Sequence, residues 1–205
     1  LKRTGEFDDT LIVFLSDNGG KLSLGADNTP LRDGKGSTYE GGYRVPMFFH
    51  WPGRVPAGKH FDHPVSALDF YPTFTGLAGA VIPEGKQLDG INIWDDLLTD
   101  RNPQRTNMIY ALRHREGYSD VGARRDQWKV ARVGQKPWQL FNIAEDIGEH
   151  HDLSDSYPER VKAMVSEVEK WSRSHTEPRW FHSLEEGQQW KESGMPHYEE
   201  TFRLD

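Results

Sequence analysis

The chain has 205 residues, a net charge of −7 at pH 7 and no cysteine. This length suffices for one sizeable core with a smaller satellite, and a composition of 35% hydrophobic and 12% aromatic residues argues against disorder. The acidic balance argues against nucleic acid as a partner, because phosphate binding depends on clusters of Lys and Arg. The lack of cysteine excludes disulfides, thiolate metal sites and a cysteine nucleophile, and no apolar run is long enough to predict a membrane span.

The first residues, Leu1 to Glu6, contain no initiator methionine and no signal-peptide core. We therefore expect the chain to be part of a longer polypeptide. Any export signal would then lie upstream of Leu1.

The first half of the sequence predicts two strands and two helices. Thr10 to Ser16 is a continuous β-branched and aromatic run, which is typical of a strand buried on both faces in a parallel sheet. Val45 to Trp51 is a second run of this kind. Ser66 to Ala78 predicts an amphipathic helix with Asp69 near its start, where negative charge is favoured. Residues 89–98 predict a turn and a short helix.

The periodicity changes after a polar linker at residues 99–106. Short segments, several with period-two alternation, predict an antiparallel sheet built from Met108–Leu112, Val121–Ala123, Trp128–Val133 and Gln139–Asn142. Apolar residues then recur with helical spacing from Pro158 to Ser174, so we expect a helix with Asp155 or Ser156 as its N-cap. The tail, Glu177 to Asp205, is aromatic and charged without a clear period, and we expect it to lie over the surface.

Asp17 and Asn18 form the first candidate site, because they follow the first predicted strand and precede Gly19 and Gly20. Their carboxylate and amide oxygens suit Ca²⁺ or Mg²⁺ better than Zn²⁺, which is usually bound by His and Cys. Calcium takes about six to eight oxygens, so further ligands must come from elsewhere. The alternative is a purely structural turn, since Asp, Asn and Gly favour turns for local reasons.

Lys35 lies between Gly34 and Gly36. A lysine between glycines can approach an anion closely, and its ammonium group is a movable point charge for a sulfate or phosphate oxygen. Glu40 and Arg44, which are four residues apart, favour a structural ion pair that pins the segment.

Three basic residues are candidates for binding an anionic substrate: His63, Arg113 and His114. The loops that carry them could border a pocket, and positive charge there would suit an anionic sugar. The alternative for each is a packing or surface role. His150 and His151 lie in a polar turn, for which we expect a solvated position.

These segments resemble the second half of a type I sulfatase of the alkaline-phosphatase superfamily. The resemblance rests first on Ser16-Asp17-Asn18-Gly19, on Gly34 to Gly42 with Arg44, and on Trp51-Pro52-Gly53. It continues in the family's order through Asp69-Phe70-Tyr71-Pro72-Thr73, Leu77-Ala78-Gly79, Trp128-Lys129 and Gln139 to Ile143, followed by Asp146, Glu149 and Asp152. The matching segments extend over residues 10–175.

The resemblance implies hydrolysis of a sulfate ester in a sulfated sugar or an aryl sulfate. In that family a formylglycine, made from a Cys or Ser in a Cys/Ser-x-Pro-x-Arg motif, attacks sulfur, and Ca²⁺ neutralises the sulfate. Asp17 and Asn18 match two metal ligands of the family, and Lys35 matches the catalytic lysine that holds a sulfate oxygen. Ser156 to Arg160 fits the letters of the nucleophile motif, but it follows the metal ligands in the chain and predicts the start of a helix instead.

The implied fold is α/β: the C-terminal part of an alkaline-phosphatase-like sheet with flanking helices, plus a small antiparallel sheet packed by a C-terminal helix. Residues 1–100 would belong to the catalytic core, 101–178 to the small subdomain and 179–205 to a surface-packed tail. The nucleophile and its formylglycine are expected in a separate N-terminal half, which is the expected partner. The 205-residue chain alone is therefore expected to be inactive, and the family points to a periplasmic or secreted location.

Two alternatives stay open at this point. One is a phosphodiesterase or phosphonate hydrolase of the same superfamily, although members with two zinc ions would be expected to have His where this chain has Asn18. The other is a non-catalytic fragment used for sugar binding or assembly. Aryl sulfates, carrageenan, ulvan and glycosaminoglycans all remain possible substrates, and the aromatic tail favours a polysaccharide.

Overall fold

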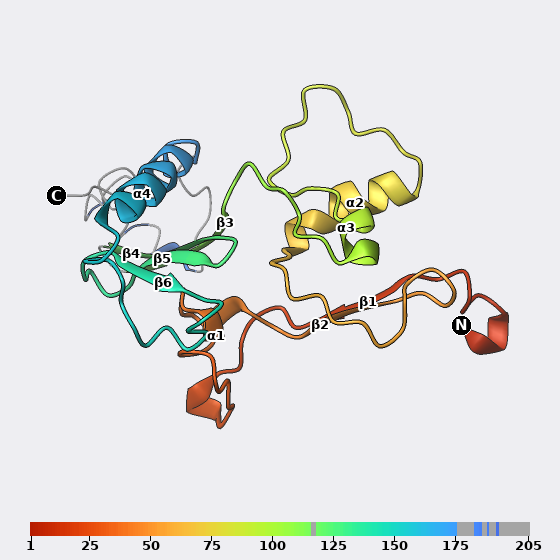
Figure 1. Ribbon diagram of the computed structural model, residues 1–205, viewed down its shortest axis with the longest axis horizontal. Coiled ribbons are helices and arrows are strands. Elements are labelled where there is room, and N and C mark those ends of the chain that lie inside the picture. Colours follow the sequence, from red (N-terminus) through yellow and green to blue (C-terminus); the bar gives the residue numbers. More distant parts are fainter. Residues whose placement is uncertain (116–117, 176–182, 186–187, 189–191, 193–205) are drawn as a thin grey trace. The chain divides into compact units, whose positions relative to one another are not determined.

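The computed structural model describes residues 1–115, 118–175, 183–185, 188 and 192 (Figure 1). The chain forms two compact units, one made of Leu1–Ser16 and Pro46–Ile109 and the other of Asp17–Val45 and Tyr110–Asp205. Residues 17–45 therefore pack with the C-terminal sheet, although the sequence pattern placed them with residues 1–100. The three-part division at residues 100 and 178 stays a prediction, and most of the 179–205 tail lies outside the described residues.

In the first unit, β1 (Ile12–Leu15) pairs antiparallel with β2 (Met47–His50), with Val13 opposite Phe49. Both runs were predicted as strands, but the prediction of a parallel strand buried on both faces was wrong. Phe14 is 57% exposed and Phe48 is 52% exposed, and their rings stack at 5.2 Å between centroids. An apolar run indicates that both faces are suited to burial, but it does not say which part of the protein covers them.

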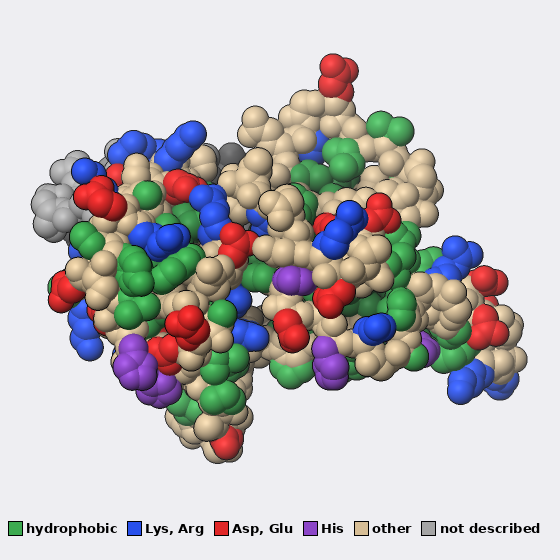
Figure 2. All heavy atoms as spheres, viewed as in Figure 1, with side chains coloured by type: hydrophobic (Ala, Val, Ile, Leu, Met, Phe, Trp, Pro, Cys, Tyr) green, Lys and Arg blue, Asp and Glu red, His purple; other side chains and the backbone are tan. Residues whose placement is uncertain are grey.

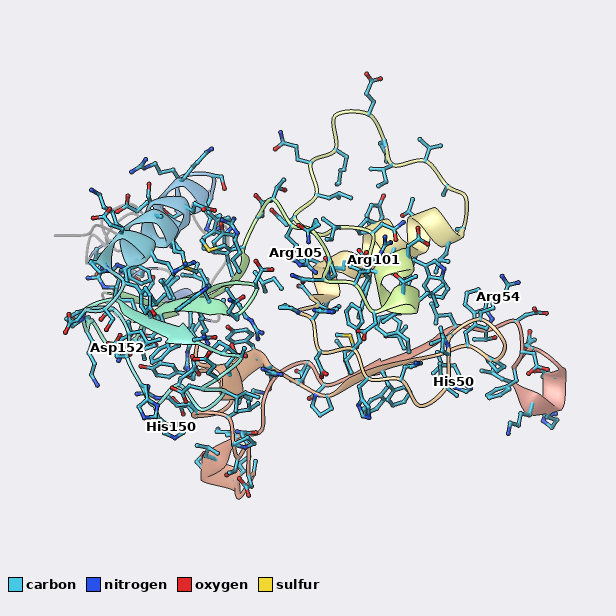
Figure 3. The ribbon with its side chains drawn as sticks, viewed as in Figure 1. His50, Arg54, Arg101, Arg105, His150 and Asp152 are labelled. Atoms are coloured by element: carbon cyan, nitrogen blue, oxygen red, sulfur yellow. The ribbon has the colours of Figure 1, made fainter. Side chains whose placement is uncertain are left out.

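The helices of the first unit are η1 (Lys2–Thr4), η3 (Ala67–Asp69), α2 (Phe70–Leu77) and α3 (Trp94–Thr99). Of these, η3 with α2 and α3 correspond to the two predicted helical segments, whereas η1 was not predicted. Ser66 and Asp69 form a capping box, in which Leu68 N donates to Ser66 Oγ and Ser66 N donates to Asp69 Oδ2 at 2.8 Å. Arg105 from the predicted linker, labelled in Figure 3, donates to both carboxylate oxygens of Asp69. The linker is irregular, as expected, but this ion pair fixes one of its residues to the helix start.

The second unit contains a four-stranded antiparallel sheet in the order β3-β4-β5-β6. Its elements are η2 (Leu22–Leu24), α1 (Glu40–Tyr43), β3 (Ile109–Arg115), β4 (Tyr118–Arg125), β5 (Trp128–Arg132), β6 (Gln139–Asn142) and α4 (Pro158–Ser172). Trp128 contacts Tyr157 and Arg160 at the start of α4, whereas Lys129 reaches Glu40 of α1. Because successive strand residues point to opposite faces, α4 and α1 cover opposite faces of the sheet (Figure 1).

The core of this unit lies on both faces of its sheet. The fully buried apolar side chains are Val121, Ala123, Val130, Ala131, Leu140 and Phe141 from the strands, with Val165 and Val168 from α4. The predicted sheet and helix are confirmed, but the N-cap of α4 is Tyr157 and not Asp155 or Ser156. Pro158 takes the first helical position, where its fixed φ and missing N–H are tolerated, and this sets the start of the helix.

Acidic and basic side chains are interspersed over the face of the molecule shown in Figure 2. No helix in the described part of the chain combines the length and apolar character that crossing a bilayer requires.

Candidate functional site

The turn that carries Asp17 and Asn18 is bonded to the segment that carries Lys35. Lys35 N–H donates to the Gly20 carbonyl at 3.0 Å, and Gly19 N–H donates to the Gly42 carbonyl at 2.9 Å. A Cβ atom on Gly19 would lie 1.7 Å from the Gly41 carbonyl oxygen, so only glycine permits this approach. The structure therefore joins the backbone segments that carry the predicted metal ligands and the predicted catalytic lysine.

Lys35 lies in a closed loop, residues 32–41, which we call the lysine loop. Gly41 N–H donates to the Arg32 carbonyl at 2.9 Å and joins the two ends, as in a compact Ω-loop. Arg113 on β3 donates from Nη1 to the Gly36 carbonyl. Gly36 has φ of +91°, and a Cβ there would collide with that guanidinium. Arg113, predicted as a substrate contact, therefore holds the residue that follows Lys35.

Asp17 is exposed and Asn18 is half-buried. Their oxygen donors fit a hard cation such as calcium, and the turn that presents them is fixed by the bond from Gly19. The described part of the chain contains no cluster of three or more His, Cys, Asp or Glu that could hold a metal. Asp17 and Asn18 can therefore supply only part of the coordination that calcium requires.

The structure describes the side chains of His63, His150 and His151 but not that of His114. His63 lies in the first unit, where Nε2 is 3.7 Å from Asp100 Oδ1 and the ring packs edge-on against Phe61. His114 is part of β3, but its side chain lies outside the described part. A substrate contact by either residue stays a prediction. His150, labelled in Figure 3, and His151 are exposed beside Asp146, as expected for a solvated turn.

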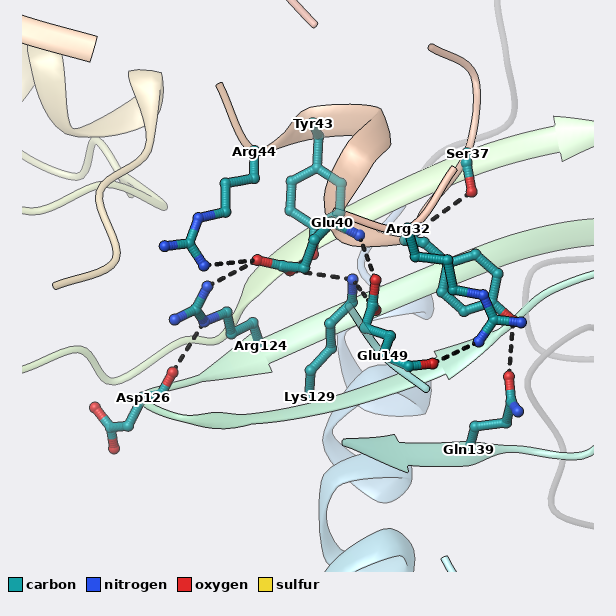
Figure 4. A network of polar contacts seen from close by, with 11 residues as sticks. Arg32, Ser37, Glu40, Tyr43, Arg44, Arg124, Asp126, Lys129, Gln139 and Glu149 are labelled. Carbon is teal, nitrogen blue, oxygen red and sulfur yellow. Dashed lines mark hydrogen bonds and ion pairs between the residues drawn. The ribbon is translucent and has the colours of Figure 1, made fainter. Parts of the chain in front are cut away.

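A buried network of charged side chains joins the end of the lysine loop, at Glu40, to the sheet (Figure 4). The carboxylate of Glu40, which is only 1% exposed, lies 3.1 Å from Lys129 Nζ, 2.9 Å from Arg124 Nη1 and 3.4 Å from Arg44 Nη1. The Glu40–Arg44 pair was predicted and is confirmed. The partners from β4 and β5 were not predicted.

Lys129 also binds Glu149, at 2.6 Å between Nζ and Oε1, and both side chains are fully buried. One feature of the sequence indicates that Lys129 has a buried acidic partner. Lys129 lies in a predicted strand whose next two residues are apolar, and a lysine is almost never buried without an acidic partner.

The two carboxylates of the network differ in their pKa. Burial alone would raise the pKa of Glu40, but the charges of Lys129 and Arg124 outweigh it and hold the pKa below its ordinary value. Burial raises the pKa of Glu149, and Lys129 only partly opposes this effect. Glu40 therefore remains ionised at neutral pH and serves as the fixed anion of the network.

Comparisons with known proteins find similarity to sulfatases. The family model "Sulfatase" matches residues 1–80, which include Asp17, Asn18 and Lys35. Arylsulfatase J of Mus musculus is 29% identical over 228 residues, covering 88% of this chain and 38% of that protein. A sulfatase of Formosa agariphila is 33% identical over 172 residues, covering 77% of this chain and 31% of that protein.

Among solved structures, the crystal structure of Ps i-CgsB in complex with k-i-k-neocarrahexaose is similar to 98% of this chain. The TM-score is 0.94 and the sequence identity is 56%. This chain covers 45% of that protein, so it spans less than half the length of each relative described. Residues 1–80 match the sulfatase family, and these similarities together support a type I sulfatase-like C-terminal fragment of the alkaline-phosphatase superfamily.

Proposed function

We propose that this chain is the part of a sulfatase that supplies Asp17, Asn18 and Lys35 for the hydrolysis of a sulfate ester. The observation that carries the proposal is the pair of backbone bonds that join the Asp17–Asn18 turn to Lys35 in the lysine loop and to Gly42 just after it. A carboxylate, an amide and an ammonium group are thereby presented by neighbouring backbone segments. This set suits the sulfate group of an ester, which the ammonium group can contact directly and the carboxylate and amide can contact through a bound cation.

Lys35 would act by electrostatics. Hydrolysis of a sulfate ester breaks the bond between sulfur and the bridging oxygen, and negative charge develops on that oxygen as the bond breaks. An ammonium group held in advance near the sulfate stabilises this charge without reorganisation. A Ca²⁺ ion held in part by Asp17 and Asn18 would supply further positive charge to the sulfate oxygens.

The nucleophile would come from another part of the enzyme. Pro158 and Arg160, which complete the only match to the family's nucleophile motif, begin α4, and the Arg160 guanidinium lies 4.3 Å above the Trp128 ring. These contacts give that segment a structural role. The formylglycine would therefore belong to an N-terminal half, and the 205 residues alone would be inactive.

The first unit offers a surface for that N-terminal half. Large apolar side chains are exposed on one face of the β1–β2 pair, at Phe14 and Phe48, and along η3 and α2, at Leu68, Tyr71, Phe74 and Leu77. Groups of exposed large apolar side chains are typical of an interface. The part of the relatives that this chain does not cover is long enough to bury it, since it exceeds half of each relative.

The substrate that we propose is a sulfated oligosaccharide of the carrageenan type. The support is the 56% identity to Ps i-CgsB, which was crystallised with k-i-k-neocarrahexaose. A polysaccharide of this kind does not cross a membrane unaided, so we also propose a periplasmic or secreted location.

The test is release of inorganic sulfate from carrageenan oligosaccharides by the native sulfatase that contains this chain, measured by ion chromatography. An aryl sulfate and a phosphonate ester serve as parallel substrates. We expect sulfate release from the oligosaccharide to be fastest, to stop after calcium chelation and to return with added Ca²⁺. Preferred cleavage of the phosphonate ester, or binding of the oligosaccharide without sulfate release, would contradict the proposal.

A further inference from the structure

Glu149 holds both ends of the lysine loop (Figure 4). At the start of the loop, Arg32 Nη1 donates to the Glu149 main-chain carbonyl at 2.8 Å. At its end, Glu40 N–H donates to Glu149 Oε2 at 2.6 Å. The main chain and the side chain of one residue thus fix the two points between which Lys35 is suspended.

Glu149 is itself rigidly placed. Its other carboxylate oxygen, Oε1, lies 2.6 Å from Lys129 Nζ, and its N–H donates to the Asp146 carbonyl at 3.1 Å. Its φ is +53°, in the left-handed region that residues other than glycine rarely adopt. Such a conformation persists only where the surrounding contacts enforce it, and it is found preferentially at functional sites.

Rigidity of this loop matters because lysine has a long and flexible side chain. Its four-carbon stem loses rotamer freedom when the ammonium group is placed, so a mobile backbone would add to that loss. Misplacing a catalytic group by about 1 Å can reduce the rate roughly a hundredfold. A closed loop with anchored ends limits such displacement.

We propose that Glu149, held by Lys129, is a positioning residue that keeps Lys35 beside the Asp17–Asn18 turn. This inference rests on the proposed function for the role of Lys35, but the anchoring of the loop can be tested without any activity. The rival explanation is that the buried charges only stabilise the sheet.

A matched control separates the two explanations. Glu167 of α4 makes a two-pronged ion pair with Arg125 of β4, at 2.6 and 2.7 Å. This pair ties the sheet to α4, on the opposite face from the lysine loop. Glu149→Gln and Glu167→Gln therefore make the same chemical change on the two faces of one sheet.

The first experiment is amide hydrogen exchange on the complete sulfatase that contains this chain and on both variants of it. In Glu149→Gln we expect the amides of Lys35, Glu40 and Gly41 to exchange about tenfold faster, because charge-assisted bonds to the anchor are lost or weakened. The amide of Val130 in β5 should accelerate clearly less than these three, by no more than the overall loss of stability measured for the same variant. Glu167→Gln should leave the lysine loop unchanged.

Unchanged exchange in the lysine loop of Glu149→Gln would overturn the proposal, as would an equal increase throughout β5. If Glu149→Gln does not fold, Glu149→Gly removes the same carboxylate and favours the left-handed φ at this position. The same exchange pattern is then required of that variant.

The second experiment measures sulfate release by the complete sulfatase. A misplaced Lys35 should lower kcat at least tenfold in Glu149→Gln while KM changes less than twofold, since Lys35 acts mainly in the transition state. Wild-type kcat in that variant would overturn the positioning role. If the wild type itself releases no sulfate, the proposed function fails, whereas the exchange result still decides whether Glu149 anchors the loop.

Discussion

Lys129 is a completely buried lysine held between two buried carboxylates, those of Glu40 and Glu149. Removing such an ion from water costs several kcal/mol, and the two ion pairs offset that cost only while both acids are present. Breaking a buried pair by removing one partner typically costs about 3–5 kcal/mol. The network therefore joins α1, and with it the lysine loop, to β5.

The pKa of Glu40 leads to a prediction about acid stability. Because this pKa is lowered in the folded chain, the stabilisation is present above the ordinary value of 4.5 and is lost as the pH falls through the lowered pKa. The effect of Glu149 on stability depends on pH in the opposite direction. Its pKa is raised in the folded chain, so the stabilisation that it contributes is lost as the pH rises through that pKa. We expect Glu40→Gln to be less stable at neutral pH and to lose less of its stability below pH 4.5.

Urea unfolding followed by tryptophan fluorescence between about pH 3 and 7 measures this effect. A single carboxylate changes the unfolding free energy by at most about 1.4 kcal/mol per pH unit. If Glu40→Gln shows the same acid dependence as the wild type, the charges of Lys129 and Arg124 do not act on Glu40 as described.

Asp17, Asn18 and Lys35 could be named as candidates from the sequence because glycines beside them mark turns and close approaches. Glu149 and Lys129 could not be placed in the same way. Their contacts with Glu40 span 109 and 89 residues of sequence, and no local pattern pairs residues so far apart. The role of Arg113 was not predicted for the same reason, since its bond to Gly36 spans 77 residues.

At the level of elements, the start of η3 and α2 depends on two capping residues with unequal roles. The Ser66 hydroxyl accepts a cap bond from Leu68 N–H. The fully buried Asp69 carboxylate makes its own cap bond and also accepts from Ile91 N–H at 3.0 Å and from Arg105. We expect Ser66→Ala to lower the unfolding free energy by about 1 kcal/mol. Asp69→Ala should cost clearly more, because it leaves Arg105 without its carboxylate.

Thermal unfolding of both variants, compared with the wild type, measures this difference. Equal losses in the two variants would contradict the account, because they would mean that the contacts with Ile91 and Arg105 contribute nothing beyond the cap.

The strands and helices could largely be predicted from periodicity, as the agreement for β5, β6 and α4 shows. The direction of β1 could not. An apolar run fixes neither the orientation of its partner strand nor the identity of what covers it, and β2, its partner here, follows only after residues 16–46. The N-cap of α4 was misplaced because Pro158, and not a polar side chain, determines where that helix begins.

At the scale of the whole molecule, residues 17–45 leave the first unit after β1, pack with the C-terminal sheet and return at β2. The sequence predicted a boundary near residue 100 because composition and periodicity change there. The assignment of residues 17–45 to the second unit depends on contacts between segments far apart in the sequence, such as that of Glu40 with Lys129, which no local pattern predicts. As a result, the proposed catalytic lysine and metal ligands rest on the small antiparallel sheet, which would act as their scaffold.

The most direct test of the account is the effect of Lys35→Met on sulfate release from carrageenan oligosaccharides by the complete sulfatase. Lys21→Met is the matched control, since Lys21 is an exposed lysine close in sequence but outside the lysine loop. We expect Lys35→Met to lower kcat/KM by at least about a hundredfold, as the loss of one preorganised charge typically does, and Lys21→Met to stay within about twofold. Wild-type activity in Lys35→Met would contradict the central claim that Lys35 stabilises the charge developing on the bridging oxygen as the sulfate ester bond breaks.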